Sequence, residues 1–183
     1  MAEPILPIER KTPMHDVDDQ LRELLPRLRR FAASLTRDHS SADDLVQASL
    51  EKALSSWDRK RPEGDLRAWL FTILYRQFLD TQRRAQRYSR MLAFFTGSQY
   101  GQHTPSAERT IVAQTTLQAF ESLSPEQRAL LLAVSVEGLS YREVAHMLDV
   151  PIGTVMSRLS RARQALRLLS EGEISPPALR ILK

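Results

Sequence analysis

The sequence predicts an all-α protein made of two small helical bundles joined by a flexible linker, the C-terminal bundle containing a helix-turn-helix. Apolar residues recur at helical spacing in several segments, and no segment alternates as a strand does. Residues 96–113 concentrate glycine, serine, threonine and proline, which is typical of an interdomain linker. A hydrophobic content of 42% is sufficient for packed cores on both sides of that linker.

The N-terminal bundle is expected to follow a flexible lead-in, residues 1–15, in which prolines recur without a helical period. From Asp16 onward, leucines such as Leu21, Leu24 and Leu28 follow the spacing of a buried helical stripe. We therefore expect a first amphipathic helix that packs against the rest of this bundle.

A second helix is expected over residues 41–57, with Ser41 as its N-cap. Asp43 and Asp44 then fall in its first turn, where the helix dipole favours negative charge. Asp44 and Gln47 are three residues apart and share a face. Spacing alone leaves open whether these side chains serve helix-end electrostatics or bind a partner. The expected core face consists of Leu45, Leu50, Ala53, Leu54 and Trp57.

A charged loop, residues 58–65, separates this helix from a long third helix that begins near Leu66. The first half of the third helix is apolar on nearly all sides, as expected of a central core helix. Its second half turns basic, and Tyr75 and Tyr88 lie among its arginines. Such a surface suits single-stranded nucleic acid, because bases stack on aromatic rings and phosphates meet guanidinium groups. The alternative is that the aromatics belong to the core and the arginines are only solvated.

The C-terminal bundle begins with a helix over residues 112–123, in which Leu117 is expected to face inward. Ser124 then caps a further helix, and Gln127, three residues on, completes a capping box. Gly138 is expected to end that helix in the left-handed conformation.

Two helices joined by a short turn follow, over residues 140–167. Ser140 and Glu143 form a second capping box, and Pro151 breaks the chain between the two helices. No acidic residue occurs between Val150 and Ser170, so the second helix is basic along its length. Such a helix fits the major groove of DNA, although an ordinary amphipathic pair with solvated arginines is the alternative. The residues expected to face DNA are Thr154, Ser157, Arg158, Arg161 and Arg163.

Composition argues against several other classes of function. The chain has no cysteine, and its histidines are scattered without ligand-like spacing, so we expect no metal site and no cofactor. No nucleophile–base pairing or phosphate-binding loop is visible, which argues against an enzyme. No apolar run is long enough to span a membrane, and the N-terminus lacks the order of a signal peptide. We therefore expect a cytoplasmic protein.

The order of these parts resembles the extracytoplasmic-function (ECF) sigma factors, the smallest bacterial transcription initiation factors. The resemblance is carried by ADDLVQASLEKAL (42–54), DLRAWLFTILYRQFLDTQRR (65–84) and LSPEQRALLLAVSVEGLSYREVAHMLDVPIGTVMSRLSRARQAL (123–166). It divides the chain into the lead-in (1–15), sigma region 2 (16–95), the linker (96–113), sigma region 4 (114–170) and a tail (171–183).

The resemblance implies binding to core RNA polymerase, at the β′ clamp helices and the β flap, and to promoter DNA. It also implies control by an anti-sigma factor and a role in stress responses. The implied polymerase contacts are Asp43, Asp44 and Gln47. The implied contacts to the −10 element are Arg76, Gln77, Asp80, Arg83 and Arg84, and the basic second helix of the helix-turn-helix would read the −35 element.

This sequence departs from the family pattern at two positions. Gln77 stands where the family often has asparagine, which affects the expected −10 base preference. Ala48 stands where the family often has glutamate, which removes one expected polymerase contact.

Two rival functions are compatible with a helix-turn-helix. The first is a dimeric transcriptional regulator that binds operators without replacing a sigma factor. The second is an adaptor that sequesters or scaffolds other proteins through its apolar helices.

Overall fold

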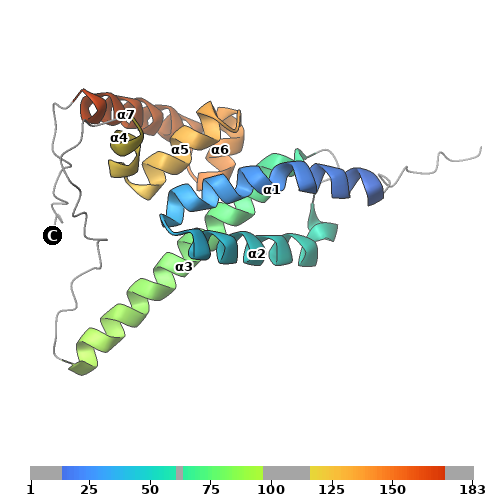
Figure 1. Cartoon of the computed structure of the whole chain (residues 1–183), viewed down its shortest axis with the longest axis horizontal. Helices are drawn as coiled ribbons and strands as arrows, with labels where there is room; N and C mark the ends of the chain where they lie inside the picture. Colours follow the sequence, from blue (N-terminus) through green and yellow to red (C-terminus); the bar gives the residue numbers. More distant parts are fainter. Residues whose placement is uncertain (1–13, 61–63, 97–115, 172–183) are drawn as a thin grey trace, which may run out of the picture.

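The structure, a computed structural model, describes residues 14–60, 64–96 and 116–171, and within them it is all-α, as the sequence predicts. Its elements are α1 (Met14–Thr36), α2 (His39–Ser55), a 3₁₀ turn η1 (Trp57–Arg59), α3 (Leu66–Thr96), α4 (Thr116–Ser122), α5 (Pro125–Ser135), α6 (Tyr141–Leu148) and α7 (Ile152–Ser170). Figure 1 shows two groups of helices, α1–α3 and α4–α7, that lie against each other.

The N-terminal bundle packs α1 and α2 around the first half of α3. Phe31 and Phe71 are almost completely buried and meet edge to face, with their ring centroids 5.0 Å apart. Trp57 and Trp69 make a similar contact at 5.7 Å, which holds η1 against α3. Such edge-to-face pairs add to the stabilisation that apolar burial provides. The first half of α3 is therefore the central core helix that its apolar sequence predicts.

The second half of α3 projects away from this bundle (Figure 1). Every residue from Arg83 to Met91 is exposed, whereas Leu70, Phe71 and Leu74 in the first half are at most 1% exposed. The same helix thus changes from a core element to a surface element where its sequence turns basic.

Local signals fix the ends of the helices in the C-terminal bundle. Both predicted capping boxes are present, one from Ser124 and Gln127 and the other from Ser140 and Glu143. Gly138 has a φ of 65°, in the left-handed region where glycine is favoured, as predicted. It does not cap the helix, however, because α5 ends at Ser135 and its C-cap is Val136. The helix-turn-helix consists of α6 and α7, whose inward side chains include the fully buried Val144, Val155 and Leu159.

The turn between α6 and α7 contains a left-handed residue that the sequence analysis did not predict. Asp149 adopts a left-handed conformation, with a φ of 55°, and forms the C-cap of α6. Aspartate tolerates this region better than most residues because its short polar side chain bonds locally.

The prediction for the start of the second helix was wrong. α2 begins at His39, and Asp38 rather than Ser41 is its N-cap, its carboxylate accepting a hydrogen bond of 2.7 Å from the Ser41 amide. Aspartate caps as well as serine does, so local preference did not separate the two. Asp43 and Asp44 therefore lie beyond the first turn. Helix-end electrostatics no longer explains why these two acids are there.

Two leucines predicted to face the core are exposed instead. Leu54 is 65% exposed because the buried stripe of α2 ends at Ala53, and the next residue is rotated by about 100° around the helix. Leu117 is 67% exposed, and Ala119 takes the buried position in α4. α2 also ends at Ser55, so that Trp57 packs from η1 rather than from the helix.

Several predicted segments lie mainly outside the described residues. They are residues 1–13 of the lead-in, 97–113 of the linker and 172–183 of the tail. α1 begins at Met14, two residues before the predicted start.

The two bundles share one interface, in which α1 packs against α5 and α3 packs against α6. The buried residues of both bundles form one continuous hydrophobic cluster. The first half of α3 is thus enclosed by helices of both bundles.

Candidate nucleic-acid interface

The basic helix α7 is held in place by its buried residues Val155, Leu159 and Ala162. These side chains fix which side of α7 faces the bundle and which side faces solvent. Four of the predicted DNA-facing residues, at spacings of three and four, lie together along one side of the helix. They are the half-buried Thr154 and the exposed Ser157, Arg158 and Arg161.

Arg163, the fifth predicted residue, is exposed but does not share that side. It lies five residues after Arg158, which is a rotation of about 140° around the helix. The structure therefore separates Arg163 from the other four. Among the described residues, neither Arg158 nor Arg161 forms an ion pair, so their guanidinium groups remain available to phosphates or base edges.

The predicted −10 residues follow α3 from its core half into its projecting half. Gln77 is half-buried, and Arg83 and Arg84 are exposed. Asp80 forms an exposed ion pair with Arg83, with 3.8 Å between the carboxylate oxygen and the guanidinium nitrogen.

Arg76 differs from the other predicted −10 residues because it contacts the other bundle. Its Nη2 donates a hydrogen bond of 3.2 Å to the carbonyl oxygen of His146, in α6. The beginning of the predicted −10 surface thus lies directly beside the helix-turn-helix.

The two tyrosines of α3 divide between the two interpretations that the sequence left open. Tyr75 is 3% exposed and packs in the core. Burial, assisted by the negative charge of Glu126 and opposed by the positive charge of Arg158, raises the pKa of Tyr75 to about 12. Tyr88, by contrast, is 59% exposed among the arginines of the projecting half. Of these two tyrosines, it is Tyr88 that is placed as a stacking surface for bases would be.

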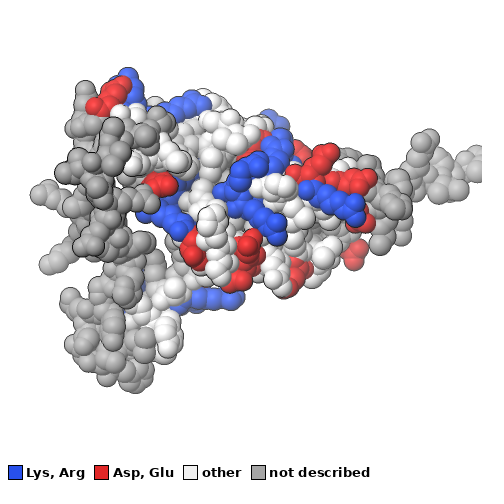
Figure 2. Space-filling view, viewed as in Figure 1, with Lys and Arg blue, Asp and Glu red and all other residues white. Residues whose placement is uncertain are grey.

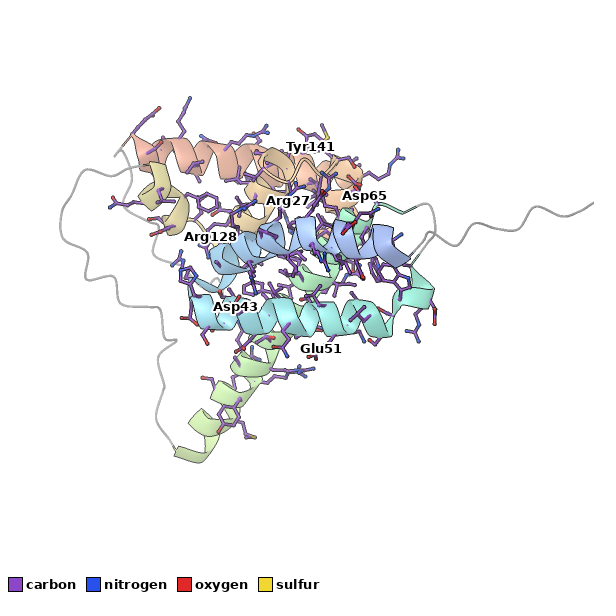
Figure 3. The ribbon with its side chains drawn as sticks, turned by 45° about the vertical axis from the view of Figure 1, so that its right-hand side comes forward. Arg27, Asp43, Glu51, Asp65, Arg128 and Tyr141 are labelled. Atoms are coloured by element: carbon purple, nitrogen blue, oxygen red, sulfur yellow. The ribbon has the colours of Figure 1, made fainter. Side chains whose placement is uncertain are left out.

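The predicted polymerase contacts lie on the outer face of α2. Asp43 pairs with Arg29 of α1 at 3.2 Å, and both side chains are well exposed. Gln47 donates a hydrogen bond of 3.1 Å to Glu51, one turn along the helix. Asp44 and Ala48 are exposed on the same face. Figure 2 shows acidic side chains spaced along α2, and Figure 3 shows Asp43 and Glu51 at the two ends of this row.

The sequence analysis missed two charged residues that are buried, Arg128 at 2% exposed and Glu137 at 3%. Arg128 lies three residues before the buried Leu131, and a charge on the apolar face of a helix is the only local signal that could have found it. Glu137 lies in the loop between α5 and α6, where no pattern marks it.

These features define a class of protein. An exposed, basic second helix of a helix-turn-helix, together with a separate basic helix on another bundle, is the arrangement of a transcription protein that contacts DNA at more than one place.

Comparisons with known proteins identify the family within that class. Residues 21–75 match the family model "Sigma2 domain of PhyR", and residues 113–166 match the model "Sigma-70, region 4". The ECF RNA polymerase sigma factor EcfG of Rhodopseudomonas palustris is 35% identical over 159 residues, which cover 82% of this chain and 83% of that protein. The ECF RNA polymerase sigma factor SigL of Mycobacterium tuberculosis is also 35% identical, over 76% of this chain and 80% of its own length.

A solved structure agrees with these sequence matches. The sigma factor RpoE of Bartonella quintana, in complex with the anti-sigma factor NepR, has a TM-score of 0.69 and 34% sequence identity, and the match covers 86% of this chain and 98% of that one. The chain belongs to the ECF RNA polymerase sigma factors, as the resemblance predicted. It is an RNA polymerase sigma factor, a regulatory rather than a catalytic protein, and the dimeric regulator is not favoured. Within the part of the chain that the structure covers, no helix has both the length and the apolar character needed to cross a membrane.

Proposed function

We propose that the N-terminal bundle binds core RNA polymerase and the melted −10 element, while the C-terminal bundle binds the −35 element as duplex DNA. The observation that carries this proposal is the pair of exposed basic helical surfaces on separate bundles, one on α7 and one on the projecting half of α3. The exposed basic helix α7 is of the kind that fits the major groove. The second adds Tyr88 to its arginines, as suits unpaired bases.

The outer face of α2 supplies the polymerase contact in this proposal. Asp44 and Gln47 are exposed there, and their position beyond the first turn leaves them without a role in capping α2. The partner of this face is the clamp helices of the β′ subunit, and region 4 docks on the β flap. Because both bundles belong to one chain, binding of one raises the effective concentration of the other, so that joint engagement gives useful affinity.

We also propose that an anti-sigma factor controls this protein. The support is the structure of the Bartonella quintana relative, which was solved with its anti-sigma factor NepR. A partner of the same kind fits a chain whose functional surfaces lie on both bundles.

The proposal is tested by abortive transcription with core polymerase on genomic fragments, with and without the protein. We expect initiation at a defined set of promoters only when the protein is present. Tight binding of the purified protein alone to a palindromic site would support the dimeric regulator instead. Unchanged transcription after Arg158→Ala and Arg161→Ala would support the adaptor.

The polymerase contact is tested separately by Asp44→Asn, with Asp18→Asn as the matched control. Asp18 is an exposed aspartate on α1. We expect only Asp44→Asn to weaken binding to core polymerase in a pull-down titration. Equal binding by the two variants would remove α2 from the polymerase interface.

A further inference from the structure

Two large apolar side chains lie exposed at the start of α7, which runs along the outer edge of the C-terminal bundle (Figure 1). Ile152 is 49% exposed and Met156 is 55% exposed. They are four residues apart, so they are neighbours on one side of the helix. Single exposed apolar residues need no explanation, but two on one turn of a basic helix form a small apolar surface that is open to solvent.

The order of side chains around α7 shows what lies beside this apolar pair. Each residue is rotated by about 100° from the one before it. Between Ile152 and Arg161, the residues that point most directly away from the buried side are therefore small, and all are exposed: Ser160, Gly153 and Ser157. We call these three residues the small-residue ridge. Met156 borders the ridge on one side, and Arg161 borders it on the other.

The packing of the chain does not account for the glycine of this ridge. A Cβ on Gly153 would meet no atom of the described residues within 4 Å, and Gly153 does not have a positive φ. An alanine would therefore fit here and would favour the helix more than glycine does. Glycine is also used where a backbone must come close to a ligand. The missing side chain thus points to a partner that approaches α7 closely at this position.

Ser157 keeps the ridge low as well. Its Oγ donates a hydrogen bond of 3.1 Å to the carbonyl oxygen of Thr154, one turn back along the helix. The hydroxyl group is thus turned toward the backbone, and its oxygen still has the capacity to accept a hydrogen bond from outside. A flat base edge that carries an amino group fits such a surface.

The major groove of DNA has the features that this side of α7 would complement. The second helix of a helix-turn-helix enters that groove with its N-terminal residues at the base edges. Among the four bases, thymine is the one that presents an apolar group there, its C5 methyl. Ile152 and Met156 offer an apolar contact for that methyl group. Methionine suits the contact because its unbranched thioether side chain adapts to the shape of its neighbour.

The surrounding charge favours DNA over a protein as the partner of this apolar pair. Arg161 and Arg163 are exposed, and they lie on the two different sides of the ridge. No acidic residue occurs between Val150 and Ser170. A partner that covers the apolar pair also meets these arginines, and DNA supplies negative phosphates on both sides of its groove.

We propose that Ile152 and Met156 recognise a thymine of the −35 element through its C5 methyl group, with the small-residue ridge of α7 lying closest to the base edges. This inference rests on the proposed function, which places α7 in the −35 duplex. It adds a specificity contact on the side of the ridge that is opposite to Arg161.

The base preference is tested with core polymerase and the full chain. The probe is one promoter fragment that this holoenzyme transcribes, with its −35 positions randomised. We expect the parent to select thymine at one position or at adjacent positions, and Met156→Gln to reduce that preference about threefold, since one apolar contact is lost. Glutamine has a helix propensity close to that of methionine, so the fold is kept.

Leu117→Gln is the matched control, because Leu117 is an equally exposed apolar residue of the same bundle, 67% exposed on α4. We expect the control to select the same bases as the parent, and Ile152→Gln to resemble Met156→Gln. Equal thymine selection by the parent and by Met156→Gln would overturn the proposal. Weaker binding of Met156→Gln to all sequences alike, with thymine selection unchanged, would assign the residue to a protein contact and would overturn it too.

Deoxyuridine provides a test of the methyl group itself, because it differs from thymine only in lacking the C5 methyl. Each thymine of the −35 element is replaced in turn, on either strand. We expect one replacement to weaken binding of the parent holoenzyme about threefold and to leave the affinity of the Met156→Gln holoenzyme unchanged. A parent that is indifferent to every replacement would disprove the contact, as would an equal loss in the parent and in Met156→Gln.

Gly153→Ala tests the close approach and separates it from a role in folding. We expect this variant to be at least as resistant to urea as the parent, since alanine favours a helix. We also expect its holoenzyme to bind the promoter fragment about tenfold more weakly, because the added methyl group holds α7 away from the base edges. Unchanged promoter binding would place Gly153 away from the DNA and would contradict the arrangement.

These results keep the inference distinct from the proposed function. A parent holoenzyme that initiates normally but does not distinguish thymine from deoxyuridine rejects the inference alone. A parent that initiates at no promoter rejects the proposed function, and the inference then fails with it.

Discussion

The arginines of this molecule fall into two groups that differ in what their guanidinium groups contact. Five arginines bond across the two bundles, to backbone carbonyls or to Glu137: Arg27, Arg37, Arg67, Arg76 and Arg128. The described arginines of α7 and of the projecting half of α3 are all exposed. Residue type is the same in both groups, and all of these arginines except Arg37 lie in helices. What differs is whether the guanidinium group bonds to a residue of the opposite bundle. The net charge of +4 counts both groups alike, so it does not tell which arginines stabilise the fold and which are available to bind a polyanion.

The largest expected effect comes from removing a covered arginine. Arg128→Ala leaves the carbonyls of Ser34 and Leu123 without their charged donor inside the interface. We expect a loss of about 3 kcal/mol in the free energy of unfolding, measured by urea denaturation. Arg163→Ala, on the exposed side of α7, is expected to change that free energy by no more than about 0.5 kcal/mol. Comparable losses would show that burial does not separate the two groups.

The next effect concerns two exposed arginines on different sides of α7. Arg158→Ala is expected to relax preference at particular −35 positions by about 1–3 kcal/mol, because a base-reading side chain discriminates by that amount. Arg163→Ala is expected to weaken transcription from all promoters to a similar, small extent, since Arg163 lies on another side of the helix. Transcription from promoters with single −35 substitutions measures both. Uniform weakening by Arg158→Ala would make Arg158 a phosphate contact.

The two tyrosines of α3 allow a similar comparison. Tyr88→Ala is expected to weaken binding to single-stranded DNA by about 1 kcal/mol, because an exposed ring is lost from the stacking surface. Tyr75→Phe keeps the buried ring and is expected to leave that affinity unchanged. Fluorescence anisotropy with one oligonucleotide measures both variants. An effect of Tyr75→Phe as large as that of Tyr88→Ala would indicate that the core of α3 is opened when DNA binds.

The smallest effect is the pH dependence of the exposed cap of α2. The hydrogen bond from the Ser41 amide lowers the pKa of Asp38 below its ordinary value of 3.8. The carboxylate therefore stabilises the fold above that ordinary value, and this contribution is lost as the pH falls through the lower value of the folded state. An asparagine at this position would cap the helix without titrating. We expect Asp38→Asn to lose less stability than the parent in denaturation between about pH 5 and pH 3, and identical losses would argue against the cap.

The sequence predicts most of the local structure because its signals are local. Ser124 and Ser140 specify helix starts through partners only three residues away, and Gly138 marks a turn by its own backbone freedom. Asp38 was missed because Ser41, three residues later, satisfies the same rule. The long-range contacts could not be predicted from the sequence, for a physical reason. Arg128 meets Ser34 across 94 residues and Arg27 meets Glu137 across 110, and no periodicity encodes such pairs.

The candidate site was predictable in part for the same reason. Helical spacing is sufficient to place Arg158 and Arg161 outward and to group Asp44 with Gln47. It does not reveal that Arg76 is engaged by the opposite bundle, since that depends on how α3 and α6 pack.

The length of α3 has a mechanical consequence. Its 31 residues form one helix about 46 Å long, whose first half is packed in the core and whose residues 83–91 are exposed. A small rotation of the packed end therefore displaces the far end of the helix by a larger distance. Substitutions at Phe71 or Leu74, deep in the core, would therefore change the position of the Tyr88 ring, although neither residue contacts it. Under the proposed function, the accuracy of promoter opening therefore depends on the packing of the hydrophobic interior as well as on the surface.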